Sequence, residues 1–232
     1  MRERPNSMGR LAKTAVDNTL VERTIQFVWD SLTPWRNDPE RVHVDGEEEL
    51  NAQLHNFLEV RSRQQFPMVF FQHEQRQADR RRVDLAAKPV SPVIIKGVSY
   101  NKYLPILVIE GKRLPPPSKD REREYVTGGE KLSGGIQRFK LGLHGKAHDA
   151  AIIVGYVQKQ DIRQWHSQVN DWIAELAKSD PEEWSADETL TEFSTEDQST
   201  RSRSVSKHPR SISHARSPIR LFHFWIQCVN VS

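Results

Sequence analysis

The sequence contains very little cysteine. Cys228 is the only one among 232 residues, which excludes an internal disulfide framework and any cysteine-based zinc site. No apolar run approaches the roughly 20 residues that a membrane-spanning helix needs, and the N-terminal segment Met-Arg-Glu-Arg-Pro-Asn-Ser has no apolar signal core. These absences predict a protein with no membrane partner that works in a reducing, cytoplasmic setting.

Polar and charged residues dominate what is present. Hydrophobic residues make up 36% of the chain and the mean hydropathy is −0.70, so we expect part of the chain to lie outside the core. The length suits one domain of ordinary size. A net charge of +3 and a pI near 9.0 are mildly basic, which weakly favours nucleic acid as a partner.

The spacing of apolar residues predicts an α/β fold, with a mixed central sheet flanked by helices, an N-terminal helix and a C-terminal strand. We expect an N-terminal arm and helix over 1–44, a core over 45–178, and a polar, basic extension with a final strand over 179–232, packed on the same domain. Helices are predicted over about 14–32, 47–63, 129 or 132 to 143, and 160–178, and strands over 66–71, 80–87, 104–114, 150–157 and 219–229.

The apolar run 104–114, Leu-Pro-Ile-Leu-Val-Ile-Glu-Gly-Lys-Arg-Leu, ends in a Glu-x-Lys pair. Prolines bound it on both sides, which is typical of a short buried strand. Glu110 and Lys112 are two residues apart, so their side chains lie on the same face of the sheet. A carboxylate and an ammonium group at the end of a buried strand are costly to desolvate unless they are paired or used.

Further carboxylates precede this pair. Asp84 lies on the predicted strand 80–87, which the connection 88–103 allows to pair with the Glu110 strand. Two carboxylates held together by a sheet form an all-oxygen ligand set suited to Mg²⁺ or Mn²⁺. We therefore expect Asp84 and Glu110 to bind a metal ion and Lys112 to orient or deprotonate the attacking water.

Three consecutive glutamates begin the second predicted helix. Glu47 shares a helix face with Leu50 and Leu54, and we expect it to assist at the metal site, with Glu48 as the alternative. The other interpretation is that the run Glu47, Glu48 and Glu49 only favours the positive end of the helix dipole. The sequence does not decide which of the three faces the site.

The order of these residues resembles the restriction-endonuclease-like superfamily, PD-(D/E)xK, whose core is an αβββαβ unit. Arg82-Val83-Asp84-Leu85 corresponds to its metal-binding Asp strand, Ile109-Glu110-Gly111-Lys112-Arg113 to its Glu-x-Lys strand, and Glu47 to its helical acid. The resemblance covers about residues 45–158. It departs from the family pattern at Val83, where the family motif has proline.

This resemblance implies a metal-dependent nuclease that hydrolyses phosphodiester bonds, most simply in DNA, with RNA not excluded and a homodimer open. Gln137 is placed like the glutamine that many members carry on the helix after the third strand. A looser similarity to small nuclease-like proteins encoded with bacterial defence genes implies an antiphage effector with protein partners. The alternative is a catalytically inactive nuclease-fold subunit that binds nucleic acid or acts as a scaffold in a multi-protein complex.

Basic residues beside this constellation are candidates for contacts to nucleic acid. Arg138 and Lys140, on the helix after the third strand, either hold phosphates or are solvated charges, and Arg113 follows the Glu-x-Lys pair. Simpler interpretations stay open: Asp84 pairs with a neighbouring arginine of 80–82, and Glu110 with Lys112 at a strand end. Gln137 can equally be a polar residue on a helix face.

The C-terminal part contains histidines and many basic residues. The spacing of His208, His214 and His223 is irregular and no cysteine joins them, so solvated or phosphate-binding roles are expected rather than zinc binding. The alternative for His223 is that the last strand places it against the core. We expect the basic segment 201–220 to be a flexible arm, which would contact phosphates without reading sequence.

Overall fold

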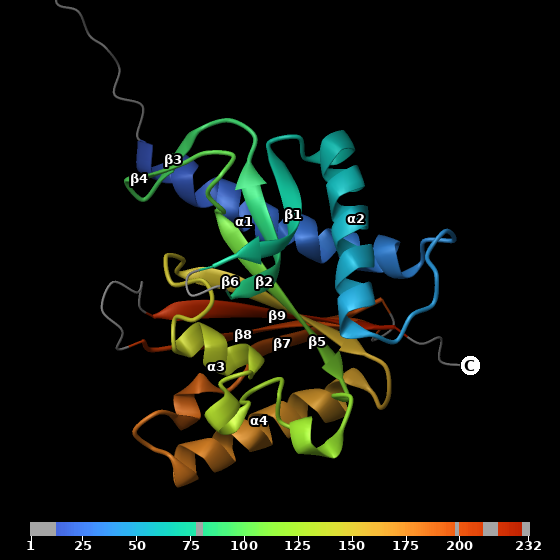
Figure 1. Ribbon diagram of the computed structural model, residues 1–232, viewed down its shortest axis with the longest axis vertical. Coiled ribbons are helices and arrows are strands. Elements are labelled where there is room, and N and C mark those ends of the chain that lie inside the picture. Colours follow the sequence, from blue (N-terminus) through green and yellow to red (C-terminus); the bar gives the residue numbers. More distant parts are fainter. Residues whose placement is uncertain (1–12, 78–80, 198–199, 211–217, 229–232) are drawn as a thin grey trace, which may run out of the picture.

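A computed structural model describes residues 13–77, 81–197, 200–210 and 218–228. Its centre is a mixed seven-stranded sheet in the order β1-β2-β5-β6-β9-β8-β7, with helices on both faces (Figure 1). The predicted α/β fold, with an N-terminal helix and a C-terminal strand, is confirmed. The sheet strands are β1 (Val69–Arg76), β2 (Arg82–Pro89), β5 (Leu107–Leu114), β6 (Ala150–Val157), β7 (Thr191–Glu196), β8 (Arg201–His208) and β9 (Ile219–Gln227).

In the described part of the chain, four α-helices cover the sheet. Two lie on one face and two on the other (Figure 1). They are α1 (Lys13–Arg36) and α2 (Glu47–Gln65), then α3 (Gly135–Lys140) and α4 (Ile162–Ser179). From α2 to β6 the order is helix, three antiparallel strands, helix and parallel strand, once the small hairpin β3 (Val93–Ile95) and β4 (Val98–Tyr100) is set aside.

That hairpin occupies the 88–103 connection and leaves the sheet intact. β2 and β5 pair directly, with Leu85 opposite Ile109 and Ala87 opposite Leu107. β5 then pairs in parallel with β6 from Ile109 to Leu114. The insertion therefore does not separate the two strands on which Asp84 and the Glu-x-Lys pair lie.

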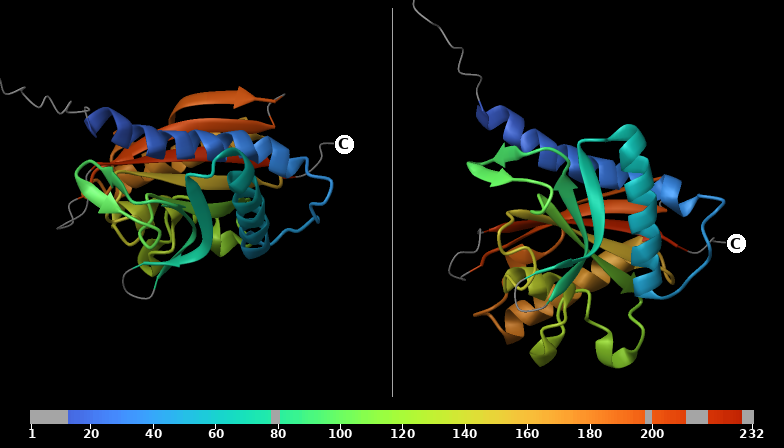
Figure 2. Two further views of the ribbon diagram at one scale, coloured as in Figure 1. Left: turned by 90° about the horizontal axis from the view of Figure 1, so that it is seen from above. Right: turned by 45° about the horizontal axis from the view of Figure 1, so that its top comes forward.

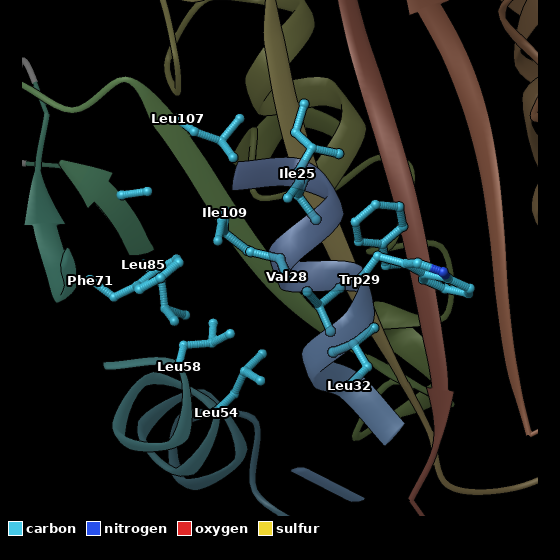
Figure 3. Packing of buried hydrophobic residues seen from close by; sticks show 14 of the residues in the cluster. Ile25, Val28, Trp29, Leu32, Leu54, Leu58, Phe71, Leu85, Leu107 and Ile109 are labelled. Atoms are coloured by element: carbon cyan, nitrogen blue, oxygen red, sulfur yellow. The ribbon is translucent and has the colours of Figure 1, made fainter. Parts of the chain in front are cut away.

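Each face of the sheet has its own apolar core. On one face, Ile25, Val28 and Leu32 of α1 share one apolar cluster with Leu107 and Ile109 of β5, and Figure 3 shows Val28 near Ile109. Figure 2 shows α1 lying across this side of the sheet. The other face is covered by α3 and α4, whose inward side chains include Phe139, Trp165, Val169 and Ile173. Strands buried on both faces read as continuous apolar runs, as β6 does.

Two local expectations are wrong. α1 continues past Pro34 to Arg36, because a proline in the last turn removes few intrahelical bonds. α3 is confined to Gly135–Lys140, because a 3-10 turn, Gly129–Lys131, precedes it.

The expected flexible arm is also wrong where the chain is described, because Arg201–His208 is strand β8. Its inward side chains are the small polar Ser202, Ser204, Ser206 and the ring of His208, all buried. The alternation has period two, but no apolar residue marks the inner face. None of the described helices combines the length and apolarity that crossing a bilayer requires.

A glycine allows β6 and β9 to pair in the middle of the sheet. Gly155 lies opposite Trp225, and a Cβ atom on Gly155 would lie 2.3 Å from Cδ1 of that indole. The indole cannot easily turn away, because its Nε1 donates to the buried hydroxyl of Tyr125 at 2.7 Å. The strand therefore needs a residue without a side chain at this position.

We expect Gly155→Ala to lower the free energy of unfolding by about 1–3 kcal/mol through overpacking against Trp225. Urea denaturation at neutral pH measures this. Ser99→Ala, on the exposed strand β4, serves as the control and should change the midpoint little. Equal midpoints for Gly155→Ala and the parent chain would contradict the steric argument.

Candidate active site

A buried carboxylate lies at the centre of the candidate site. Glu110 is 1% exposed and three basic side chains surround it. Its Oε1 lies 2.8 Å from Nη1 of Arg138 and 3.2 Å from Nζ of Lys112. Its Oε2 lies 3.2 Å from Nδ1 of His144, and neither of these two atoms has another hydrogen-bond partner among the described residues. The side chain is thus approached from β5, α3 and the loop after α3.

Asp84 reaches the same region from β2. The pairing of β2 with β5 ends at Leu85 and Ile109. Asp84 and Glu110 are the next residues beyond this pair, where the two strands separate. At this point the Asp84 Oδ2 accepts a hydrogen bond of 2.7 Å from the backbone N–H of Gly111. The Asp84 carboxylate therefore binds a backbone N–H group of β5 beyond the end of the strand pairing, which fixes it beside Glu110 and Lys112.

Glu47 comes to the site from the first turn of α2. Its Oε1 accepts from Nζ of Lys112 at 2.8 Å, and its Oε2 from the backbone N–H of Arg113 at 3.1 Å. Among the three glutamates that begin α2, Glu47 is the one that contacts the Glu-x-Lys strand. This agrees with the expectation from its helix face.

The small residue inside Glu-x-Lys makes this approach of α2 feasible. A Cβ atom on Gly111 would lie 2.0 Å from Oδ1 of Asn51 and 2.9 Å from the Tyr156 ring. Asn51 is buried and accepts a hydrogen bond of 2.7 Å from the Tyr156 hydroxyl. Glu47 lies one helical turn before Asn51, on the same side of α2. Close packing over Gly111 therefore sets the position of Glu47.

The charges in the site influence one another strongly. Burial, together with the neighbouring charge of Glu110, raises the pKa of Asp84 to about 8. Burial alone would raise the pKa of Glu110, but its three basic neighbours outweigh this and hold that pKa below its ordinary value. For Lys112 burial acts to lower the pKa, and the surrounding carboxylates reverse this and raise it.

The donor types, though not a complete ligand set, are those that a hard divalent cation prefers. Mg²⁺ is commonly held by one or two carboxylates, with water and substrate phosphate completing its shell. Asp84 and Glu110 supply two such carboxylates on adjacent strands, and a cation between them would stabilise the ionised form of Asp84. Within the described ranges no group of three or more histidine, cysteine or acidic side chains is arranged to hold a metal ion. Binding at Glu110 would also require a basic neighbour to move from Oε1.

Comparison with known proteins adds no assignment. No protein-family model matches the sequence, and no curated protein or solved structure is significantly similar to it. Function therefore has to be argued from the geometry of the site.

Three further predicted residues, Arg138, Gln137 and Arg113, differ in how they are placed relative to Glu110. Arg138 belongs to the site, but as the ion-pair partner of Glu110. Gln137 lies beside it on α3 and holds the preceding loop, since its amide oxygen accepts from the N–H of Gly128 at 2.9 Å. The Arg113 guanidinium donates to Gln158 at 2.9 Å and lines a small pocket beside Glu47.

His144 was not singled out from the sequence. It is 1% exposed and lies between Gly142 and Gly145, which both have positive φ. The turn brings Gly145 so close to β5 that a Cβ atom there would lie 3.1 Å from a methyl group of Val108. Two glycines flanking a histidine just after a predicted helix were the signal available in the sequence.

Lys140 is not available for nucleic acid, so this prediction is wrong. It is 7% exposed, its Nζ lies 2.6 Å from both carboxylate oxygens of Glu188, and it lies 4.3 Å from the centre of the Trp184 ring. Residues two apart on a helix point to different sides. Arg138 therefore faces Glu110, while Lys140 faces the 3-10 helix Ala186–Glu188.

A chain of buried hydrogen bonds starts at Glu188 and runs across the sheet. Nδ1 of His208 lies 2.5 Å from the Glu188 carboxylate. The Ser206 hydroxyl lies 2.6 Å from Nε2 of His208 and 2.7 Å from Nε2 of His223. Nδ1 of His223 lies 2.8 Å from the Tyr125 hydroxyl. These bonds connect β8 and β9 to the loop that leads into α3.

If both imidazole rings are neutral, the hydrogen bonds from Glu188 to Tyr125 can run in only one direction. The carboxylate accepts only, so His208 donates from Nδ1 and its Nε2 accepts the single proton of Ser206. The Ser206 oxygen then accepts from Nε2 of His223, whose Nδ1 accepts from Tyr125. Burial lowers the pKa of both histidines, which favours these neutral forms.

These contacts correct the expectation for the C-terminal histidines. His208 and His223 are both buried and hydrogen-bonded, which contradicts solvated or phosphate-binding roles and agrees with the alternative that His223 lies against the core. His214 lies outside the described residues. The order Ser206–His208–Glu188 is that of a hydrolase triad. All three side chains are buried, however, and Ser206 is also bound by His223, so the arrangement is structural.

We expect His208 and His223 to remain neutral below pH 6.5, where a free imidazole gains its proton, and His223 to remain so to a lower pH than His208. Nitrogen chemical shifts across a pH titration measure both the charge and the tautomer. His208 should carry its proton on Nδ1 and His223 on Nε2. The reversed tautomers, or a midpoint at or above 6.5 for either ring, would show that the deduced direction is wrong.

Proposed function

We propose that this chain is a metal-dependent nuclease of the restriction-endonuclease-like type, PD-(D/E)xK, which hydrolyses phosphodiester bonds in DNA and works in the cytoplasm. One observation supports this most directly. Side chains from three separate elements, Asp84 on β2, Glu110 and Lys112 on β5, and Glu47 on α2, converge at the point where β2 and β5 separate. RNA is the second substrate to test.

Each residue has a role that follows from its position. Asp84 and Glu110 would hold Mg²⁺ or Mn²⁺, which when bound stabilises negative charge on phosphate and lowers the pKa of water. Lys112, 3.2 Å from Glu110, would orient water or stabilise charge on the phosphate. Glu47 positions the Lys112 ammonium group. Arg138 is partly exposed and would leave Glu110 to bind a substrate phosphate.

We expect the purified chain to cut DNA in the presence of Mg²⁺ or Mn²⁺ and not in EDTA. Asp84→Asn and Lys112→Met should each lower the rate at least about 100-fold, because each removes a group acting on the reacting phosphate. Cleavage of plasmid, single-stranded DNA and RNA is followed on gels. Lys178→Ala, an exposed lysine on α4, is the matched control and should keep full activity. Equal rates for Lys178→Ala and Lys112→Met would contradict the proposal.

A second candidate function is a catalytically inactive nuclease fold that binds nucleic acid or acts as a scaffold. The observation that favours it is the set of three basic groups around Glu110, which neutralise the carboxylate without any metal ion. In this case the ion pairs would stabilise the fold and Asp84 would act only through its bond to Gly111.

Metal binding separates the two candidates without an activity assay. If Asp84 and Glu110 hold Mn²⁺, thermal unfolding should shift upward with Mn²⁺, by about 2.7 kcal/mol in stability at a hundredfold excess over Kd. Asp84→Asn should abolish the shift, and Lys178→Ala should keep it. A parent chain with no shift in Mn²⁺ or Mg²⁺ would favour the inactive fold.

A further inference from the structure

The outer strands carry a row of exposed basic residues that take no part in the candidate active site. Arg203 and Lys207 project from β8 and Arg220 from β9, and all three are exposed. Val205 and Phe222 lie half-buried between them. We call these five residues the β8–β9 stripe. Their period-two spacing on paired strands places them on one face of the sheet.

Like charges face each other within the stripe. Lys207 is directly opposite Arg220 in the antiparallel register, an arrangement that costs stability unless an anion lies nearby. Among the described residues neither side chain has a carboxylate within ion-pair distance, and the same holds for Arg203. The pair is therefore suited to bind an external anion.

An aromatic surface lies beside these charges. Phe222 is opposite Val205, and the Arg220 guanidinium lies 4.7 Å from the centre of its ring. Phe222 and Phe224 form part of the floor of a pocket of about 540 Å³. This volume is within the range of about 300–1,000 Å³ typical of small-molecule sites. A planar base can stack on Phe222 when the Arg220 guanidinium turns from the ring to a phosphate.

The two ends of the pocket differ in charge. α1 contributes Ile25 and Glu22 on one side, and β7 contributes Glu192 on the other. These two carboxylates would repel phosphate. Lys207 lies outside that lining, beyond the Val205–Phe222 pair. The phosphate groups are therefore expected at the Lys207–Arg220 end and the base over Phe222.

The stripe and the candidate active site lie on opposite faces of the sheet. Phe222 packs with the α1 cluster, whereas Glu110 is contacted by Arg138 of α3. One phosphodiester group cannot touch both places. A ligand of the stripe would thus be held independently of the reaction.

We infer that the β8–β9 stripe is a binding site for single-stranded nucleic acid, in which a base stacks on Phe222 and the backbone phosphates bind Lys207 and Arg220. Stacking on a half-buried ring requires an unpaired base, which favours a single strand over a duplex. Such binding needs neither metal nor hydrolysis, so the inference goes beyond the proposed function.

Fluorescence anisotropy with labelled oligothymidine and oligouridine in EDTA tests the inference. The full chain should bind, more weakly as salt increases, and Lys207→Glu should weaken binding about fivefold or more at ~0.1 M salt and reduce the salt slope by about 0.7. Phe222→Leu, which keeps the floor apolar, should weaken binding about 5- to 150-fold. Lys178→Glu changes the net charge identically on α4 and should bind like the parent chain.

Two results would overturn the inference. One is equal loss for Lys207→Glu and Lys178→Glu, which would mean that net charge alone attracts the oligonucleotide. The other is unchanged binding by Phe222→Leu with equal affinity for duplex and single strand, which would assign the surface to polyanions in general. Asp84→Asn should bind like the parent chain. Binding without any cleavage would refute the proposed nuclease and leave the stripe standing.

Discussion

Burying the carboxylate of Glu110 is the constraint on which the site depends. An ionised group out of water is tolerated only with close partners. Lys112, Arg138 and His144 provide them from three directions, so α3 and the loop after it must pack against β5. Lys112 is in turn held by Glu47, which fixes the first turn of α2. Elements on both faces of the sheet are therefore positioned by one group of charges.

Much of this could be predicted from the sequence, because it depends on short-range patterns. The apolar run of β5, its Glu-x-Lys ending and the strand with Asp84 are local features, and their pairing needed only a connection long enough to turn. Glu47 followed from the helical period. The contacts among these residues agree with those predictions, whereas metal binding and hydrolysis stay predictions.

The features that were not predicted correctly depend on contacts with residues distant in the chain. Lys140 can be buried because Glu188, 48 residues later in the chain, forms an ion pair with it. No local sequence pattern predicts such a distant partner. His144 is placed by two glycine turns and not by periodicity. β8 was missed because its inner face consists of serines and a histidine, which are satisfied by hydrogen bonds across the sheet instead of by apolar packing.

The position of β9 in the sheet has a consequence for how the molecule is made. β9 lies between β6 and β8, and its pairing with β6 joins Ala150 to Arg220. During synthesis the antiparallel strands β1, β2 and β5 emerge early and can assemble from neighbouring sequence. β6 has only one partner until Ile219–Gln227 emerges, so its second edge stays unpaired on the nascent chain. The β6–β9 pairing in the middle of the sheet cannot form before Ile219–Gln227 has emerged.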